Sequence, residues 1–190
     1  EDAATLVAHA DTVFDIADHT FTIEDGIIRS TTPNCGLGAD DRAGCAILWL
    51  LKDSGHHLLI TDGEEYGQIG AKWLVNYNPD IAEILHKSSF MVQFDRRHGR
   101  DYKFYNIPVS DEFEDFIEHS TGYTNAGKRA FTDIVTLCKS SESCCGVNLS
   151  VGYYDEHTSY ETLNIAEWTN TLNVTEQMLA NPLSRFPLAN

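Results

Sequence analysis

Short apolar runs that end in histidine or carboxylate side chains are the feature that most constrains the fold of this chain. One run ends at His9, another ends at Asp95, and a third leads into the pair Glu64–Glu65. In α/β proteins the carboxyl ends of parallel strands meet at one edge of the sheet, where ligands bind. The pattern therefore predicts that these side chains, far apart in the sequence, converge at one sheet edge.

Strand and helix patterns alternate along the chain. Apolar and β-branched runs predict strands at residues 4–8, 58–61, 90–94, 134–138 and 147–153, with a hairpin at 21–28 around Asp25-Gly26. Apolar residues at helical spacing predict helices at 42–52, 69–77, 81–86, 111–119 and 165–179. This alternation predicts one domain over residues 1–190, a three-layer α/β/α sandwich with a mostly parallel central sheet.

The composition argues against several kinds of partner. A formal net charge of -16 disfavours nucleic acid and anionic membrane surfaces, because both are themselves negatively charged. No apolar run reaches the length of about 18 residues that a membrane span needs. The cysteine count is odd and includes an adjacent pair, which predicts reduced thiols in a cytoplasmic protein instead of a disulfide framework. These cysteines are Cys35, Cys45, Cys138, Cys144 and Cys145.

Two short motifs suggest metal chemistry. In His9-Ala10-Asp11, residues i and i+2 of an extended strand point the same way, so Asp11 can support His9 as an acceptor for its second ring nitrogen. The pair Glu64–Glu65 offers one carboxylate to bind a metal and one to take a proton from metal-bound water, whose pKa zinc lowers to about 7. Each motif alone also fits an ordinary surface feature.

Asp40 and Asp95 begin loops, and His157 lies in a late polar segment. Loop aspartates commonly form turns or cap helices, and Asp41 is placed to cap the helix that starts near Arg42. The order and the strand context of the whole set favour a metal site over a chance coincidence in a metal-free α/β protein.

With these residues assembled, the chain resembles the co-catalytic dizinc exopeptidases, which include tripeptidase T-like, carboxypeptidase G-like and glutamyl or leucyl aminopeptidase families. The resemblance spans nearly the whole chain and includes two quite specific motifs. The matching segments are Ala8-His9-Ala10-Asp11-Thr12-Val13, Gly38-Ala39-Asp40-Asp41-Arg42-Ala43-Gly44, Thr61-Asp62-Gly63-Glu64-Glu65 with Gly67 and Gly70, Phe94-Asp95, and Tyr154 with His157-Thr158.

The resemblance implies a ligand set for two zinc ions. Asp40 would bridge the two ions. His9 and Asp95 would complete one site, and Glu65 and His157 would complete the other. Cobalt or manganese also suits a carboxylate-rich set with two histidines.

The resemblance also implies roles in catalysis. Glu64 would be the general base that takes a proton from water to give the hydroxide that bridges the metals, and Asp11 would orient or polarise the ligand set. Tyr154 is a candidate donor to the oxyanion of the tetrahedral intermediate. The peptide bond between Asp40 and Asp41 is expected to be cis.

The function implied is that of an aminopeptidase acting on short peptides. Hydrolysis of another amide, by an N-deacylase of N-acyl amino acids or by a carboxypeptidase, is the nearest alternative, and a catalytically silent binding relative is a further one. No segment is long enough for the lid domain of many relatives, so we expect a minimal catalytic domain. The oligomeric state, a monomer or otherwise, is not predicted by the sequence.

Overall fold

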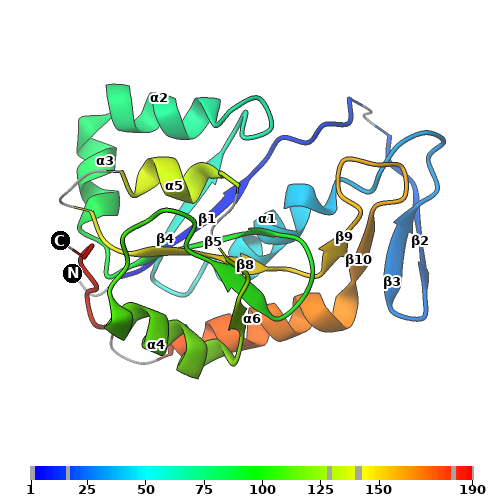
Figure 1. Ribbon diagram of the computed structural model, residues 1–190. Coiled ribbons are helices and arrows are strands. Elements are labelled where there is room, and N and C mark those ends of the chain that lie inside the picture. The colour runs from blue at the N-terminus through cyan, green and yellow to red at the C-terminus, as the bar shows by residue number, and fades with distance from the viewer. Residues whose placement is uncertain (1–2, 16–17, 128–129, 140–142, 181–182, 190) are drawn as a thin grey trace.

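The computed structural model describes residues 3–15, 18–127, 130–139, 143–180 and 183–189 (Figure 1). The helices are α1 (Ala39–Leu50), α2 (Ile69–Tyr77), α3 (Pro79–His86), α4 (Asp111–Thr121), α5 (Asp133–Leu137) and α6 (Ile165–Leu179). The strands are β1 (Thr5–His9), β2 (Phe21–Glu24), β3 (Ile27–Ser30), β4 (His57–Thr61), β5 (Met91–Arg96), β6 (Asp101–Lys103), β7 (Thr124–Asn125), β8 (Gly146–Ser150), β9 (Tyr153–Tyr154) and β10 (Thr162–Asn164).

A six-stranded sheet with the order β4-β1-β5-β8-β6-β7 forms the centre of the fold. The strands β4, β1, β5 and β8 run parallel to one another, and β6 pairs antiparallel with β8. The mostly parallel sheet predicted from the sequence is therefore confirmed. Because β1, β4 and β5 are parallel neighbours, their carboxyl ends lie along the same edge of the sheet.

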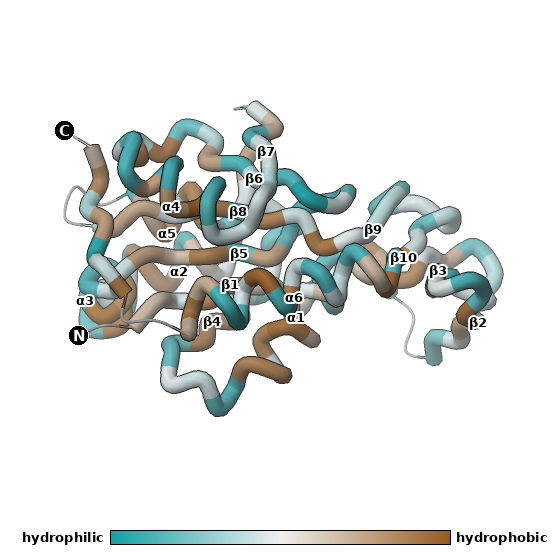
Figure 2. The backbone as a smooth tube through the Cα atoms, turned by 90° about the horizontal axis from the view of Figure 1, so that it is seen from below, coloured by the Kyte–Doolittle hydropathy of each residue, from teal (hydrophilic) through white to brown (hydrophobic). Residues whose placement is uncertain are grey.

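Helices cover both faces of this sheet and make the three predicted layers (Figure 1). Along β1, Val7 packs with α2, α3 and α5, whereas Leu6 and Ala8 pack with α1, α4 and α6. This alternation follows from the two-residue period of a strand. Strand β5 is buried on both sides and accordingly lies in a largely hydrophobic part of the tube in Figure 2.

A second, four-stranded antiparallel sheet has the order β2-β3-β10-β9 and lies beyond one end of the central sheet (Figure 1). The predicted hairpin is confirmed: β2 and β3 pair around Asp25 and Gly26, whose φ angles are 52° and 77°. Two positive φ angles in succession are the requirement of a type I′ turn, which explains the glycine.

Two predicted strands differ in the structure. Residues 134–138 were expected to form a strand, but 133–137 form the short helix α5, in which Cys138 N donates to Ile134 O. An apolar run of five residues does not reveal its period, and β-branched residues biased the prediction toward a strand. The predicted strand 147–153 ends at Ser150, because Gly152 has a φ of 86° and redirects the chain into β9 of the second sheet.

The described residues contain no helix long and apolar enough to cross a membrane. All five cysteines are free thiols, and all except Cys45 are buried.

Candidate metal centre

The predicted ligand side chains lie together at the carboxyl edge of the central sheet. His9 ends β1, Asp95 lies near the end of β5, and Glu65 follows β4. Asp40 lies at the start of α1, and His157 lies between β9 and β10. One cavity of about 300 Å³ is lined by Asp40, Glu65, Asp95 and His157. His9 is only 1% exposed and does not line it.

Short distances connect these side chains in one cluster. His9 Nε2 lies 3.1 Å from Asp40 Oδ1 and 3.6 Å from Asp95 Oδ1. His157 Nε2 lies 3.2 Å from Asp40 Oδ2 and 2.9 Å from Glu65 Oε1. Asp40 therefore contacts both imidazoles, one with each carboxylate oxygen, which is the arrangement that a bridging carboxylate requires.

The second ring nitrogen of His9 faces Asp11. His9 Nδ1 lies 3.1 Å from the backbone oxygen of Asp11 and 3.4 Å from its Oδ1. A proton on Nδ1 satisfies these acceptors and leaves the lone pair of Nε2 directed toward Asp40 and Asp95. This is the usual support of a metal-binding histidine.

The donor set fits divalent metal ions. Ligand atoms of His9, Asp40 and Glu65 all lie within 4.8 Å of one another. Glu65 Oε1 is buried and accepts no well-aligned hydrogen bond from the described residues, although His157 Nε2 is close to it. Buried carboxylates are costly without a compensating charge, and a metal ion bound among these atoms would supply that charge.

The raised pKa values of two glutamates in the site also indicate a shortage of positive charge. Burial raises the pKa of Glu64 to about 8, and the nearby charge of Asp95 contributes. Burial raises the pKa of Glu65 to about 7, and the charge of Asp40 adds to this effect. Crowded carboxylates hold protons when no cation is near them.

The pKa values of Asp40 and the two histidines, in contrast, shift so that their charged forms are favoured. Burial raises the pKa of Asp40, but its contacts with His157 and His9 outweigh burial and lower the pKa to about 2. The contact with Asp40 raises the pKa of His157 to about 9. Burial lowers the pKa of His9, but Asp40 and Asp95 reverse this effect and raise it well above its usual value. Protons and metal ions would therefore compete for the same imidazole nitrogens.

The carboxylate of Asp11 holds the loop that follows β4. The backbone N–H groups of Glu64 and Glu65 donate to Asp11 Oδ1 and Oδ2, each at 3.1 Å. Asp11 thus fixes the positions of both glutamates as well as facing the ring of His9. The sequence predicted that Asp11 supports His9, but it gave no sign of the hydrogen bonds to the backbone of Glu64 and Glu65.

The loop that carries Asp40 is held by two carboxylates. The sequence did not single out Glu161, whereas it placed Asp41 as a helix cap, and Asp41 accepts from Gly44 N–H in the first turn. The peptide bond between Asp40 and Asp41 is cis, as expected. Glu161 accepts hydrogen bonds from the backbone N–H groups of Gly38 and Asp40, at 2.5 and 2.9 Å. Asp41 accepts from the N–H groups of His9 and Gly44 and so links β1 to the first turn of α1.

Asp95 is positioned by hydrogen bonds from three neighbours. The hydroxyl of Tyr153 donates to Asp95 Oδ1 at 3.2 Å, and the hydroxyl of Thr132 donates to Asp95 Oδ2 at 2.5 Å. Gln93 Nε2 donates to both Thr132 Oγ1 and Asp95 Oδ2, at 2.8 and 3.0 Å. Position i+2 on one strand could have suggested Gln93, whereas the contact of Thr132 depends on tertiary packing.

The proposed oxyanion role of Tyr154 is not supported by its position. Its hydroxyl donates to Glu167 Oε2 at 2.7 Å, and its ring packs against His98 with centroids 5.2 Å apart. Tyr153 instead lines the cavity. Successive residues of a strand face opposite sides, so an error of one position reverses the direction of the side chain.

Comparison with solved structures finds the same fold. The aminopeptidase PepT from Bacillus cereus superposes with a TM-score of 0.72 and 16% identity, over 95% of this chain and 81% of that chain. A tripeptidase from Staphylococcus aureus gives a TM-score of 0.70 and 15% identity, over 94% and 80% of the two chains. The TET1 peptidase of Pyrococcus horikoshii superposes with a TM-score of 0.57 and 18% identity, over 85% of this chain and 52% of that chain.

No model of a protein family and no curated protein matches the sequence. At identities below one fifth, the structural similarity shows the fold, which is that of aminopeptidase catalytic domains.

Proposed function

We propose that this protein is a metallopeptidase, an aminopeptidase that hydrolyses short peptides with two zinc ions. The observation that carries the proposal is the contact of Asp40 with both His9 and His157, with Glu65 and Asp95 beside them. The aminopeptidase and tripeptidase folds found by comparison support the same class of reaction.

The ligands divide between two sites that share Asp40. His9 and Asp95 would hold one ion, and Glu65 and His157 would hold the other. Bound zinc supplies a Lewis acid, which polarises the scissile carbonyl and acidifies the attacking water. Residues 1–190 would act as one catalytic unit, because the hydrophobic clusters on both faces of the sheet support the same site.

Glu64 is the proposed general base. It lines the same cavity as Asp40, Glu65 and Asp95, so its carboxylate is available to the water that the proposed metal ions would hold. Glu64 would accept a proton from the attacking water and deliver it to the leaving amine, so the proton count balances. Asp11 holds the backbone of Glu64 in place for this transfer.

The test uses the chain reconstituted with zinc, cobalt or manganese and three substrates. Release of nitroaniline from an aminoacyl-nitroanilide supports an aminopeptidase. Cleavage only of N-acetylated amino acids would indicate a deacylase, and cleavage only at the carboxyl end of N-blocked peptides would indicate a carboxypeptidase. If none of these is cleaved at any metal loading, the proposed function is wrong.

A further inference from the structure

A second cavity lies between the second sheet and the two helices beside it. Its volume is about 510 Å³, against about 300 Å³ for the cavity of the candidate metal centre. One wall comes from β2, β3 and β10, and the other comes from α1 and the start of α6 (Figure 1). Sites for small molecules typically have volumes of about 300–1,000 Å³, so this cavity has the size of a ligand site.

The sheet wall is the apolar face of the second sheet. Phe21 on β2, Ile28 on β3 and Leu163 on β10 all line the cavity. Ile28 is paired with Leu163 on one side and with Ile23 on the other, and paired residues share one face of a sheet. Phe21 and Ile23 are 60% and 54% exposed. This face is therefore only partly covered by α1 and α6, and a hydrocarbon bound there would remove apolar surface from water.

The helical wall is formed by small and apolar side chains. Ala39, Ala43 and Ala46 line the cavity from α1, and Ile165 and Trp168 line it from α6. The indole Nε1 of Trp168 donates to Ala43 O at 3.0 Å, which satisfies its only donor and fixes the ring in the wall. Because the alanines are short, the space between the helices and the sheet stays open.

The charge of the lining is opposite to the charge of the chain. The chain has 29 acidic residues, yet none of the described residues that line this cavity is acidic. The ionisable side chains among them are Arg42 and His19. Arg42 is exposed and makes no ion pair with the part of the chain that the structure describes; its Nη1 donates only to Leu37 O, at 3.4 Å. The cavity thus presents a guanidinium without a carboxylate partner beside an apolar surface.

The guanidinium of Arg42 lies over Gly38, at the rim of the cavity. A side-chain carbon at Gly38 would come within 3.3 Å of Arg42 Cζ and 3.5 Å of its Nε. Gly38 has a φ of 66°, which suits glycine, and both residues line the cavity. The absence of a side chain at Gly38 therefore leaves room for the guanidinium beside the apolar walls.

We propose that this cavity binds a small molecule with a hydrocarbon body and a single carboxylate, of the class of medium-chain fatty acids. The hydrocarbon lies between the sheet wall and the alanines of α1. The carboxylate accepts hydrogen bonds from Arg42 at the rim, because the planar guanidinium presents parallel N–H donors that match a carboxylate. This binding requires neither a metal ion nor peptide hydrolysis, so it is independent of the peptidase function proposed above.

Isothermal titration calorimetry with decanoate tests the site on the full chain, both zinc-loaded and treated with chelator. Decanoate should bind at one molecule per chain in both conditions. It should bind more tightly than butyrate, by up to about four-fold for each additional methylene that the cavity buries. Decan-1-ol, which has the same chain without the charge, should bind about three-fold to ten-fold more weakly, since ion pairs and hydrogen bonds between charged groups contribute at this level.

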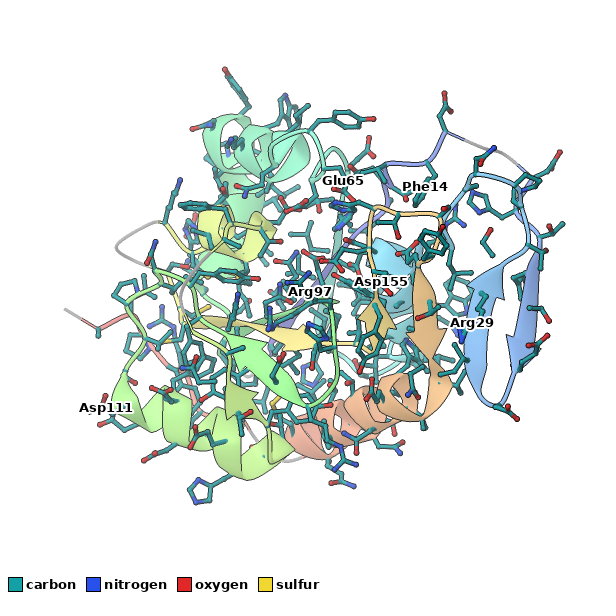
Figure 3. All side chains as sticks on the ribbon, turned by 45° about the vertical axis from the view of Figure 1, so that its right-hand side comes forward. Phe14, Arg29, Glu65, Arg97, Asp111 and Asp155 are labelled. Carbon is teal, nitrogen blue, oxygen red and sulfur yellow. The ribbon has the colours of Figure 1, made fainter. Side chains whose placement is uncertain are left out.

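Three variants test the residues. Arg42→Gln should reduce the affinity for decanoate to that for decan-1-ol, whereas Arg29→Gln should leave it unchanged. Arg29, labelled in Figure 3, follows Ile28 on β3 and therefore faces the opposite side of the second sheet. Ala46→Phe fills the cavity from an exposed position of α1 and should abolish the binding of both ligands.

Several results would overturn the site. Binding that requires zinc would place the carboxylate at the metal centre, and binding that survives Ala46→Phe would place the ligand elsewhere on the surface. Equal affinities for decanoate and decan-1-ol would show that Arg42 does not select an anion. A chain that sediments as a dimer and does not bind decanoate would show that a second copy covers the apolar face instead.

Discussion

Among the side chains that line the cavity of the candidate metal centre, the carboxylates Asp40, Glu64, Glu65 and Asp95, here called the acidic wall, are held differently from Arg97. The side chains of Asp40, Glu65 and Asp95 are 9%, 6% and 8% exposed, and buried hydrogen bonds fix their positions. Arg97 is 55% exposed and is held by one ion pair. Rigid, buried support suits groups that must keep a fixed geometry through a reaction, whereas an exposed cation can adjust to different substrates.

This difference predicts that changes in the acidic wall affect turnover more strongly than changes at Arg97. The largest effect is expected for Glu64→Gln. Removal of the base should lower kcat by about 100-fold to 10,000-fold, because general base catalysis contributes at that level. Zinc content should not change, which metal analysis of the dialysed variant can check. Glu176→Gln, on the exposed face of α6, is the matched control.

Asp133 tests whether the buried region behind the acidic wall carries unneutralised charge. Its Oδ1 is buried without a hydrogen-bond partner among the residues that the structure describes, and burial raises its pKa to about 6, above the ordinary 3.8. The unfolded chain therefore releases this proton at lower pH than the folded one, so Asp133 stabilises the fold below about pH 4 and loses this effect as the pH rises through 6. A pKa difference of about two between the folded and unfolded chain corresponds to about 3 kcal/mol in the free energy of unfolding.

Asp133→Asn should remove that share of the pH dependence. The measurement is the free energy of unfolding by urea at pH 4 and pH 7, with chelator present, for both proteins. Glu64 and Glu65 keep their own contributions of the same sign. A variant whose stability falls between these pH values as steeply as that of the unaltered protein would show that Asp133 is already compensated.

Glu161 tests how far the acidic wall depends on its support. Glu161→Gln places an amide donor where a carboxylate oxygen accepts from Gly38 or Asp40 N–H. Loss of a group that supports a metal ligand typically costs about 10-fold to 100-fold in metal affinity or activity. Competition with a chromogenic chelator measures the zinc affinity. Unchanged affinity would mean that the loop carrying Asp40 is held by Asp41 alone.

The sequence predicted those parts of the molecule that depend on local pattern. The strands ending at His9 and near Asp95 have largely apolar sequences, and the Asp25-Gly26 turn has residues that tolerate positive φ. These features determine the parallel sheet, the hairpin and the edge at which the polar side chains meet. The fold follows from these local signals because they agree with one another.

The support of the site could not be predicted, because it consists of contacts between distant residues. Glu161 reaches Asp40 across 121 positions, and Thr132 reaches Asp95 across 37. Neither contact is accompanied by a periodic pattern in the sequence. The sequence also does not show which of two neighbouring residues in a short strand, Tyr153 or Tyr154, faces the cavity.

The most direct test of the central claim, that Asp40 joins two metal sites, is the zinc content of the chain after equilibrium dialysis. The account predicts two ions per chain for the unaltered protein and loss of both on Asp40→Ala, with circular dichroism to confirm that the variant is folded. Fewer than two ions on the unaltered protein, or full occupancy in the folded variant, would contradict it.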